Sequence, residues 1–174
     1  MKIAIYGNSR QNAFLPQIAD FLKLLDKNGI EIYMSGHFSD YLLKNDIPQN
    51  WIILHDFASA DIDRVISLGG DGTFLRAAQW VGRSQVPILG INTGHLGFLA
   101  SYSLDETDEL IKAILNPVVT VEPRMLLHIE CAGMPDDFWP YALNEVAFMK
   151  SDTSSMLNVR TCLLYTSPSP RDCS

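Results

Sequence analysis

Apolar and polar positions follow two periods along the first part of the chain, and segments of the two kinds alternate. Short, continuous apolar runs indicate buried strands; they fall at 3–6, 30–34, 51–54, 65–68 and 87–91. Apolar residues at the spacing of one helix face indicate packed helices; these segments are 13–27, 39–45, 74–81 and 104–115. This alternation is typical of a doubly wound, Rossmann-like α/β domain, which we expect over residues 1–116.

The pattern changes after Asn116-Pro117, which ends the last of these predicted helices. Strand-like runs then follow one another without a helical segment between them, at 118–122, 125–130, 141–148 and 156–159. Successive strands without helices favour an all-β architecture. We therefore expect residues 117–161 to form the start of a second, β-sandwich domain that is incomplete in this chain.

Residues 162–174 abandon the strand pattern and end in a Ser/Pro-rich sequence that cannot continue a central strand. We interpret this tail as non-native, from a frame error, adapter-derived sequence or truncated assembly. The fold prediction therefore rests on residues 1–161.

Composition narrows the classes of function. The 174 residues are 47% hydrophobic, which is enough for a sizeable core. A net charge of −7 argues against binding nucleic acid or an anionic membrane through bulk electrostatics. The sequence suggests neither a signal-peptide core nor a transmembrane span. An odd number of cysteines (Cys131, Cys162, Cys173) without metal-binding spacing fits reduced thiols, so we expect a cytoplasmic protein.

A glycine-rich turn follows the apolar run at 65–68, with the sequence Gly69-Gly70-Asp71-Gly72-Thr73. Glycines let a phosphate approach the backbone and permit positive φ. The turn leads into a helix, whose N-terminus offers unpaired N–H groups and the positive end of the helix dipole. Gly69, Gly70, Gly72 and Thr73 are therefore candidate phosphate-binding residues. The alternative is a tight connection without a ligand, in which Asp71 acts as the N-cap.

A second loop with well-spaced glycines, 92–99, follows the next apolar run. Loops at the carboxyl ends of strands line the ligand crevice of open α/β sheets, so Asn92 and Gly94 are further candidates for phosphate binding. The alternative is a tight turn in which Phe98 and Leu99 pack as core. His95 is expected to be a surface or hydrogen-bonded residue, because no nucleophile that it could activate lies nearby in sequence.

Asn144 and Glu145 place an amide and a carboxylate side by side in an otherwise apolar run. Neighbouring strand residues point to opposite faces, so at least one of the two would face inward and need a polar partner. A sugar hydroxyl of a substrate is one such partner. The alternative is an edge strand with one solvated face.

The turn at 69–73, the loop at 90–99 and the Asn144-Glu145 pair, in this order and spacing, together resemble the NAD kinase family in its bacterial, Bacteroidetes-type form. The resemblance covers residues 1–161. The first motif alone is less specific, because diacylglycerol kinases, sphingosine kinases and phosphofructokinases carry similar turns. The resemblance implies ATP-dependent phosphorylation of the 2′-hydroxyl of the adenosine ribose of NAD, giving NADP, with a divalent metal such as Mg²⁺.

The resemblance also implies roles for individual residues. Asp71 resembles the family's proton acceptor and lies with Gly72 at the NAD site, with Arg76 nearby on the helix. Phe98 resembles the residue that packs against the adenine.

In the second predicted domain, Asn144 and Glu145 resemble the pair that holds the ribose and nicotinamide end. Ser155 falls at a further NAD-binding position.

The chain departs from the family at its C-terminal end, where members continue into a Gly-Ser-Thr-Ala-Tyr-type segment that completes the substrate site. We therefore expect a fragment that is poorly soluble and lacks kinase activity, whereas full-length members are generally homo-oligomers. Two other interpretations stay open: a lipid kinase of the diacylglycerol type, and a non-catalytic nucleotide-binding module. The sequence leaves open whether ATP or polyphosphate is the donor, and whether NADH is accepted.

Overall fold

The structure is a computed structural model that describes residues 1–147 except 56, 58–59, 95–96, 101 and 137. Met1–Leu143 forms one compact unit, and Asn144–Ser174 belongs to a second. The strand-like run predicted at 156–159 and the tail at 162–174 lie outside the described residues.

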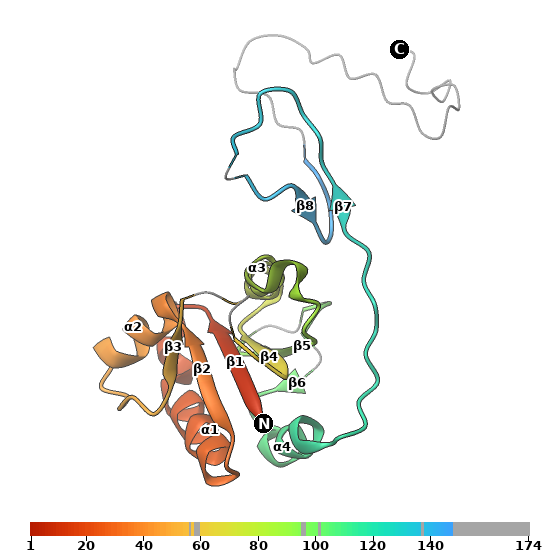
Figure 1. Cartoon of the computed structure of the whole chain (residues 1–174). Helices are drawn as coiled ribbons and strands as arrows, with labels where there is room; N and C mark the ends of the chain where they lie inside the picture. The colour runs from red at the N-terminus through yellow and green to blue at the C-terminus, as the bar shows by residue number, and fades with distance from the viewer. Residues whose placement is uncertain (56, 58–59, 95–96, 101, 137, 148–174) are drawn as a thin grey trace. The chain divides into compact units, whose positions relative to one another are not determined.

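A six-stranded parallel sheet forms the centre of the first unit (Figure 1). Its strands are β1 (Lys2–Gly7), β2 (Glu31–Ser35), β3 (Ile52–Leu54), β4 (Arg64–Leu68), β5 (Ile88–Asn92) and β6 (Tyr102–Ser103). The strand order is β3-β2-β1-β4-β5-β6. The direction of winding therefore reverses between β1 and β4, and ligands of open α/β sheets bind at such a switch point.

Helices cover both faces of the sheet (Figure 1). They are α1 (Leu15–Lys27), α2 (Gly36–Lys44), α3 (Asp71–Val81) and α4 (Thr107–Leu115), with 3-10 turns η1 (Asn12–Phe14) and η2 (Gly82–Ser84). Ile3 and Ile5 of β1 pack in the core cluster that contains α1, α2 and α4 residues. Ala4, which points to the opposite face, packs in the cluster that contains Val81 of α3. The predicted doubly wound fold is confirmed for this part of the chain.

Asn28 and Gly29 follow the last residue of α1 and end the helix. Gly29 has a φ of 69°, and its N–H donates to the carbonyl of Asp26 at 2.8 Å. The N–H of Ile30 donates to the carbonyl of Leu25 at 3.2 Å. These bonds close the last turn of the helix and redirect the chain into β2.

The start of α3 differs from the prediction, because the helix begins at Asp71 rather than at residue 74. Gly70 is the extended residue before the helix, and its carbonyl accepts from the N–H groups of Thr73 at 2.9 Å and Phe74 at 3.2 Å. Asp and Gly disfavour helix interiors, but an acidic residue in the first turn is stabilised by the helix dipole. Periodicity of apolar residues therefore placed the helix start too late.

Residues 118–122 do not form the predicted strand. Val118 is 80% exposed and Val121 is 54% exposed, so among the described residues this run has no partner that packs against it as a strand requires. An antiparallel pair follows, formed by β7 (Leu127–His128) and β8 (Tyr141–Ala142). The β-sandwich predicted for residues 117–161 remains a prediction.

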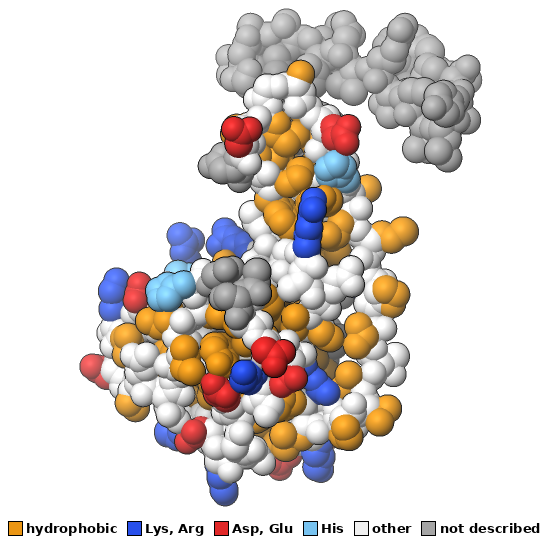
Figure 2. Space-filling view, viewed as in Figure 1, with side chains coloured by type: hydrophobic (Ala, Val, Ile, Leu, Met, Phe, Trp, Pro, Cys, Tyr) orange, Lys and Arg blue, Asp and Glu red, His pale blue; other side chains and the backbone are white. Residues whose placement is uncertain are grey.

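Large hydrophobic side chains are exposed beyond α4, and orange side chains are visible on the β7–β8 hairpin in Figure 2. Met125 is 94% exposed, and Leu126, Leu127 and Phe138 are each exposed by 44–50%. Among the described residues, no helix is long and apolar enough to cross a membrane.

Candidate functional site

The glycine turn joins β4 to α3 at the carboxyl edge of the sheet, beside the switch point. A Cβ at Gly70 or Gly72 would meet no heavy atom within 4 Å, so these positions face open space. Among the described residues, the N–H groups of Gly70, Asp71 and Gly72 have no acceptor. Free N–H groups at a helix N-terminus with open space before them are the features that bind a phosphate.

Gly69 has a different role in the turn. Its φ is +150°, and a Cβ there would collide with the side chain of Thr73, whose own Cβ would lie 2.8 Å away. Thr73 is only 7% exposed. Gly69 is therefore required by the backbone conformation and by packing against Thr73, so the turn combines one structural glycine with two open ones.

The carboxylate of Asp71 connects the glycine turn to the second loop. Its Oδ2 accepts from the N–H of Phe98 at 2.9 Å, and its Oδ1 accepts from the N–H of Leu99 at 3.0 Å. The N–H groups of Phe98 and then Leu99 lower the pKa of Asp71, because they stabilise the charged form, and their effect outweighs the opposing effect of burial. Asp71 is therefore held ionised between two loops that lie far apart in sequence.

Two glycines allow the second loop to come this close. A Cβ at Gly97 would collide with the Asp71 carboxylate, and a Cβ at Gly90 would lie 2.8 Å from Cα of Ala100. Asn92 is buried, and its Oδ1 accepts from the N–H of Gly94 at 2.9 Å, which shapes the turn after β5. Gly97 thus permits close contact between the loop and Asp71, and Gly90, on β5, permits close contact between that strand and Ala100.

Phe98 is 100% exposed, so it does not pack as core, which was one of the two interpretations of this loop. Leu99 beside it is half-buried. The backbone of Phe98 contacts Asp71, and its fully exposed ring is a surface on which a flat ligand can stack. His95 lies outside the described residues.

Arg76 is exposed on α3, one turn beyond the glycine turn. Burial raises the pKa of Tyr6, at the end of β1, and the positive charge of Arg76 partly offsets that rise. Arg76 therefore places its charge near the carboxyl end of β1. It forms no ion pair with any residue that the structure describes.

The remaining predicted site residues belong to the second unit or lie outside the described residues. Asn144 and Glu145 are exposed residues of the second unit, which is described only to residue 147. Ser155 lies outside the described residues. The role of all three therefore stays a prediction.

The loop after β1 contains contacts that the sequence pattern did not reveal. Gln11 is only 5% exposed, and its side-chain amide donates to the carbonyls of Asn8 at 2.8 Å and Leu68 at 2.9 Å. A glutamine in a polar loop is expected at the surface. Its buried position follows from the pairing of β1 with β4, which the pattern of residues along the chain does not specify.

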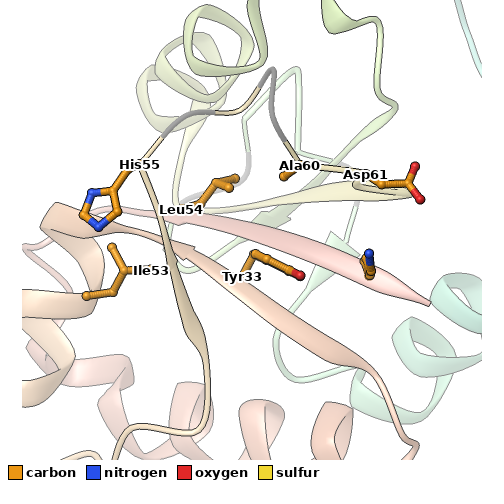
Figure 3. A pocket seen from close by; sticks show the side chains of 7 residues that line it. Tyr33, Ile53, Leu54, His55, Ala60 and Asp61 are labelled. Atoms are coloured by element: carbon orange, nitrogen blue, oxygen red, sulfur yellow. The ribbon is translucent and has the colours of Figure 1, made fainter.

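A hollow of about 450 Å³ lies elsewhere on the molecule, next to β2 and β3 (Figure 3). Residues from β1, β2, β3 and the segment before β4 line it: Lys2, Tyr33, Ile53, Leu54, His55, Ala60 and Asp61. None of the predicted site residues is among them. The candidate site is therefore the edge at the glycine turn and not this hollow.

No group of three or more metal-ligating side chains occurs among the described residues. A metal ion that arrives with a nucleotide needs only one or two carboxylates, because phosphates and waters supply its other ligands. Asp71 is the carboxylate at the glycine turn, and it retains acceptor capacity beyond its two backbone contacts. The residues at the turn thus fit a nucleotide-borne metal and not a site made wholly of protein ligands.

The fold and the loops at its carboxyl edge define a doubly wound nucleotide-binding type of domain. It is similar to a crystal structure of yeast NADH kinase complexed with NADH, with a TM-score of 0.53, 20% identity and coverage of 66% of this chain and 37% of that one. This likeness concerns the fold alone.

Sequence comparison identifies the family. Residues 3–119 match the ATP-NAD kinase N-terminal domain. The chain is 46% identical over 165 residues to the NAD kinase of Bacteroides fragilis, covering 94% of this chain and 57% of that one. It is 40% identical to the NAD kinase of Porphyromonas gingivalis over 93% of this chain and 56% of the relative. The chain belongs to the NAD kinase family, and the predicted kinship with Bacteroidetes members is confirmed. It spans somewhat over half the length of these relatives.

Proposed function

We propose that this chain takes part in ATP-dependent phosphorylation of NAD at the 2′-hydroxyl of its adenosine ribose, which gives NADP. The observation that carries the proposal is the Asp71 carboxylate, ionised and fixed between the glycine turn and the Phe98 loop. A hydroxyl that attacks a phosphoryl group needs positioning, charge stabilisation and a group that receives its proton. This edge of the sheet offers a group for each requirement.

The reaction assigns a separate task to each part of the turn. As the ribose oxygen bonds to the γ-phosphorus, its proton passes to Asp71, and the bond from that phosphorus to the leaving ADP oxygen breaks. The free N–H groups of Gly70 and Gly72 and the dipole of α3 stabilise negative charge on the transferred group. A divalent cation held by the phosphates and Asp71 would supply further charge neutralisation.

The exposed ring of Phe98 is proposed to stack on the adenine of NAD. The backbone N–H of Phe98 donates to Asp71, so an adenine stacked on Phe98 would lie beside the residue that contacts the proton acceptor. Arg76 is proposed to contact the same substrate from α3. Asn144 and Glu145 are proposed to bind the ribose and nicotinamide end, and Ser155 is proposed as a further NAD-binding residue.

Beyond the reaction itself, we propose a cytoplasmic location and homo-oligomeric assembly. An odd cysteine count with Cys131 as an exposed free thiol fits a reducing compartment. Assembly is proposed from the resemblance to the family and is checked by sedimentation of the purified protein.

The test uses a hybrid in which residues 1–147 replace the matched part of the Bacteroides fragilis NAD kinase. We expect ATP-dependent formation of NADP from NAD, measured by coupling to an NADP-specific dehydrogenase. A diacylglycerol offered in place of NAD should give no product. A folded hybrid that binds NAD without turnover would favour a non-catalytic binding module and would refute the proposal.

A further inference from the structure

We propose that Gln11 is a positioning residue for the phosphoryl donor. It fixes the loop Gly7–Gln11 to the glycine turn, so that Ser9 and Arg10 at the tip of this loop contact the donor's phosphates. The inference rests on the proposed function and extends it to a loop that no motif of the sequence marks.

The first step is the bond between the two loops. The carbonyl of Leu68, the residue directly before Gly69, accepts from the N–H of Asn8 at 3.1 Å and from Nε2 of Gln11 at 2.9 Å. The same Nε2 donates to the carbonyl of Asn8 at 2.8 Å. One buried amide group thus joins the end of β1 to the start of the glycine turn.

The orientation of this amide follows from its neighbours. Nε2 faces two carbonyl oxygens, and a flipped amide would place an oxygen against both of them. Oε1 is consequently the free end, and it is a buried acceptor with no hydrogen-bond partner among the described residues. A buried acceptor without a partner lowers the free energy of unfolding, and an apolar side chain at this position would not have that cost. The hydrogen bonds that Gln11 donates to Leu68 and Asn8 offset it.

Other side chains hold the same loop in place. The hydroxyl of Tyr41 accepts from the N–H of Gln11 at 3.2 Å and donates to Oδ1 of Asn12 at 2.8 Å. Nε2 of His37 lies 2.8 Å from the carbonyl of Gly7. A Cβ at Gly7 would collide with the ring of Phe38. Residues of α2 therefore fix both ends of the loop, and a fixed loop binds a ligand with less loss of entropy.

Ser9 and Arg10 at the tip of this loop are exposed. The N–H of Arg10 donates to Oδ1 of Asn8 at 3.1 Å, which sets the turn. The Arg10 guanidinium has no ion pair among the residues that the structure describes. In a chain with a net charge of −7, an unpaired arginine at the switch point suits a polyphosphate anion.

The strand order indicates which substrate lies on this side. β4 has β1 on one side and β5 on the other, and the β5 side carries the Asp71 contact and the exposed Phe98 ring. Donor and acceptor oxygens lie on opposite sides of a transferred phosphoryl group. The acceptor NAD is proposed on the β5 side, which leaves the β1 loop for the donor.

The experiment measures binding of ATP and of NAD separately by calorimetry, using the full 174-residue chain. Gln11→Leu removes both donated bonds, and Gln17→Leu makes the same change at an exposed position of α1. We expect Gln11→Leu to weaken ATP binding by about tenfold or more, because a displaced loop would lose about one strong hydrogen bond from Ser9 or Arg10 to the phosphates. NAD binding should change by less than about twofold, and Gln17→Leu should match the parent in both.

A second variant keeps the test decisive if Gln11→Leu unfolds. Arg10→Ala alters only an exposed side chain, and it should weaken ATP binding by about fivefold to tenfold while NAD binding is unchanged. In the hybrid enzyme the same variants should raise the KM for ATP and leave the KM for NAD unchanged. If Gln11 had a purely structural role, the variants would instead have a lower unfolding temperature and would bind both ATP and NAD more weakly.

The outcomes separate this inference from the proposed function. If the parent chain binds ATP and NAD but Arg10→Ala and any folded Gln11 variant bind ATP as the parent does, the inference is wrong and the proposed function stands. Equal weakening of both ligands would also overturn the inference. If the folded hybrid enzyme forms no NADP from NAD and ATP, the proposed function itself fails.

Discussion

At the scale of single residues, Asp71 has two roles that must be separated. It is the proposed proton acceptor, and it also anchors the second loop through the N–H groups of Phe98 and Leu99. Replacing it changes both properties at once. A variant that disturbs the anchor but keeps the carboxylate is therefore the natural comparison, and Gly97 provides it because a Cβ there would collide with Asp71.

In the hybrid enzyme, we expect Asp71→Asn to lower turnover by about 10²–10⁴-fold, because general-base help is lost, while NAD binding remains measurable. Gly97→Ala should lower turnover much less, since the carboxylate is still present. Gly36→Ala, where a Cβ would meet only Ile53 at 3.9 Å, is the matched control. Equal losses in Asp71→Asn and Gly97→Ala would show that Asp71 acts only as an anchor.

The lowered pKa of Asp71 predicts how stability depends on pH. A carboxyl whose pKa is lower in the folded state stabilises the protein above the unfolded pKa of about 4. This contribution is lost as pH falls from that value through the lower folded pKa. Urea unfolding at several pH values should therefore show a steeper acid loss for the parent than for Asp71→Asn. If the free energies of unfolding of the parent and Asp71→Asn fell in parallel with pH, the lowered pKa of Asp71 would not contribute to stability.

The sequence predicted part of this site and missed part of it for physical reasons. The glycine turn was recognisable because glycine permits backbone conformations that other residues avoid and Asp is favoured at helix N-termini. The open positions at Gly70 and Gly72 are compatible with the proposed phosphate contact. The bond between Asp71 and the Phe98 loop spans 27 residues and depends on the order of strands in the sheet. The buried setting of Gln11 depends on the same order, which residue types alone do not specify.

At the scale of elements, different glycines of the turn allow the stability of the domain and its binding of ATP to be tested separately. Gly69→Ala should destabilise the domain by about 1–3 kcal/mol, because φ is +150° and the new Cβ would meet Thr73. Gly72→Ala should leave stability unchanged or raise it by up to about 1 kcal/mol. The same Cβ occupies space proposed for phosphate, so ATP binding should weaken. Urea unfolding and calorimetric titration measure the two effects, and unaltered ATP binding by Gly72→Ala would argue against a phosphate at this position.

A second prediction at this scale concerns the end of α4. Nη1 of Arg64, on β4, donates to the carbonyl of Ile114 at 2.6 Å, and its Nη2 donates to that of Asn116 at 2.7 Å. Arg64→Met should lower the free energy of unfolding by about 1–3 kcal/mol, because terminal helix carbonyls lose charged donors. Arg124→Met, which breaks only an exposed ion pair with Glu122, should change it by less than about 1 kcal/mol. If Arg64→Met and Arg124→Met lowered the free energy of unfolding in urea equally, Arg64 would not stabilise the end of α4.

Element positions could be predicted where burial dictated the pattern. Four of the five longest strands, β1, β2, β4 and β5, were found because their apolar runs contribute to the core, and β3 was found from its apolar run although Ile52 in it is exposed. The two-residue strand β6 was missed, since two residues carry no periodicity. The run at 118–122 has the composition of a strand, but pairing depends on a neighbour that local composition does not reveal.

At the scale of the whole molecule, the apolar side chains beyond α4 predict self-association. Exposed apolar patches of more than a few hundred Å² are uncommon on monomers. We expect the 174-residue chain to sediment as concentration-dependent oligomers, and the double variant Val121→Thr, Met125→Gln to shift it toward monomer. Leu43→Gln, at an apolar residue of α2 that is 43% exposed, is the control. If the double variant sedimented as the parent does, these side chains would not be the surface through which the chain self-associates.

The contact between Asp71 and the Phe98 loop has a consequence for how substrate structure controls rate. If the adenine stacks on Phe98, a change in the position of that residue alters the position of the Asp71 carboxylate, because the N–H groups of Phe98 and Leu99 hold it. Binding energy from a remote part of the substrate would then be used to align the reacting hydroxyl with its base. A dinucleotide analogue with a smaller base in place of adenine should lose turnover as well as affinity, even though the ribose and its 2′-hydroxyl are unaltered.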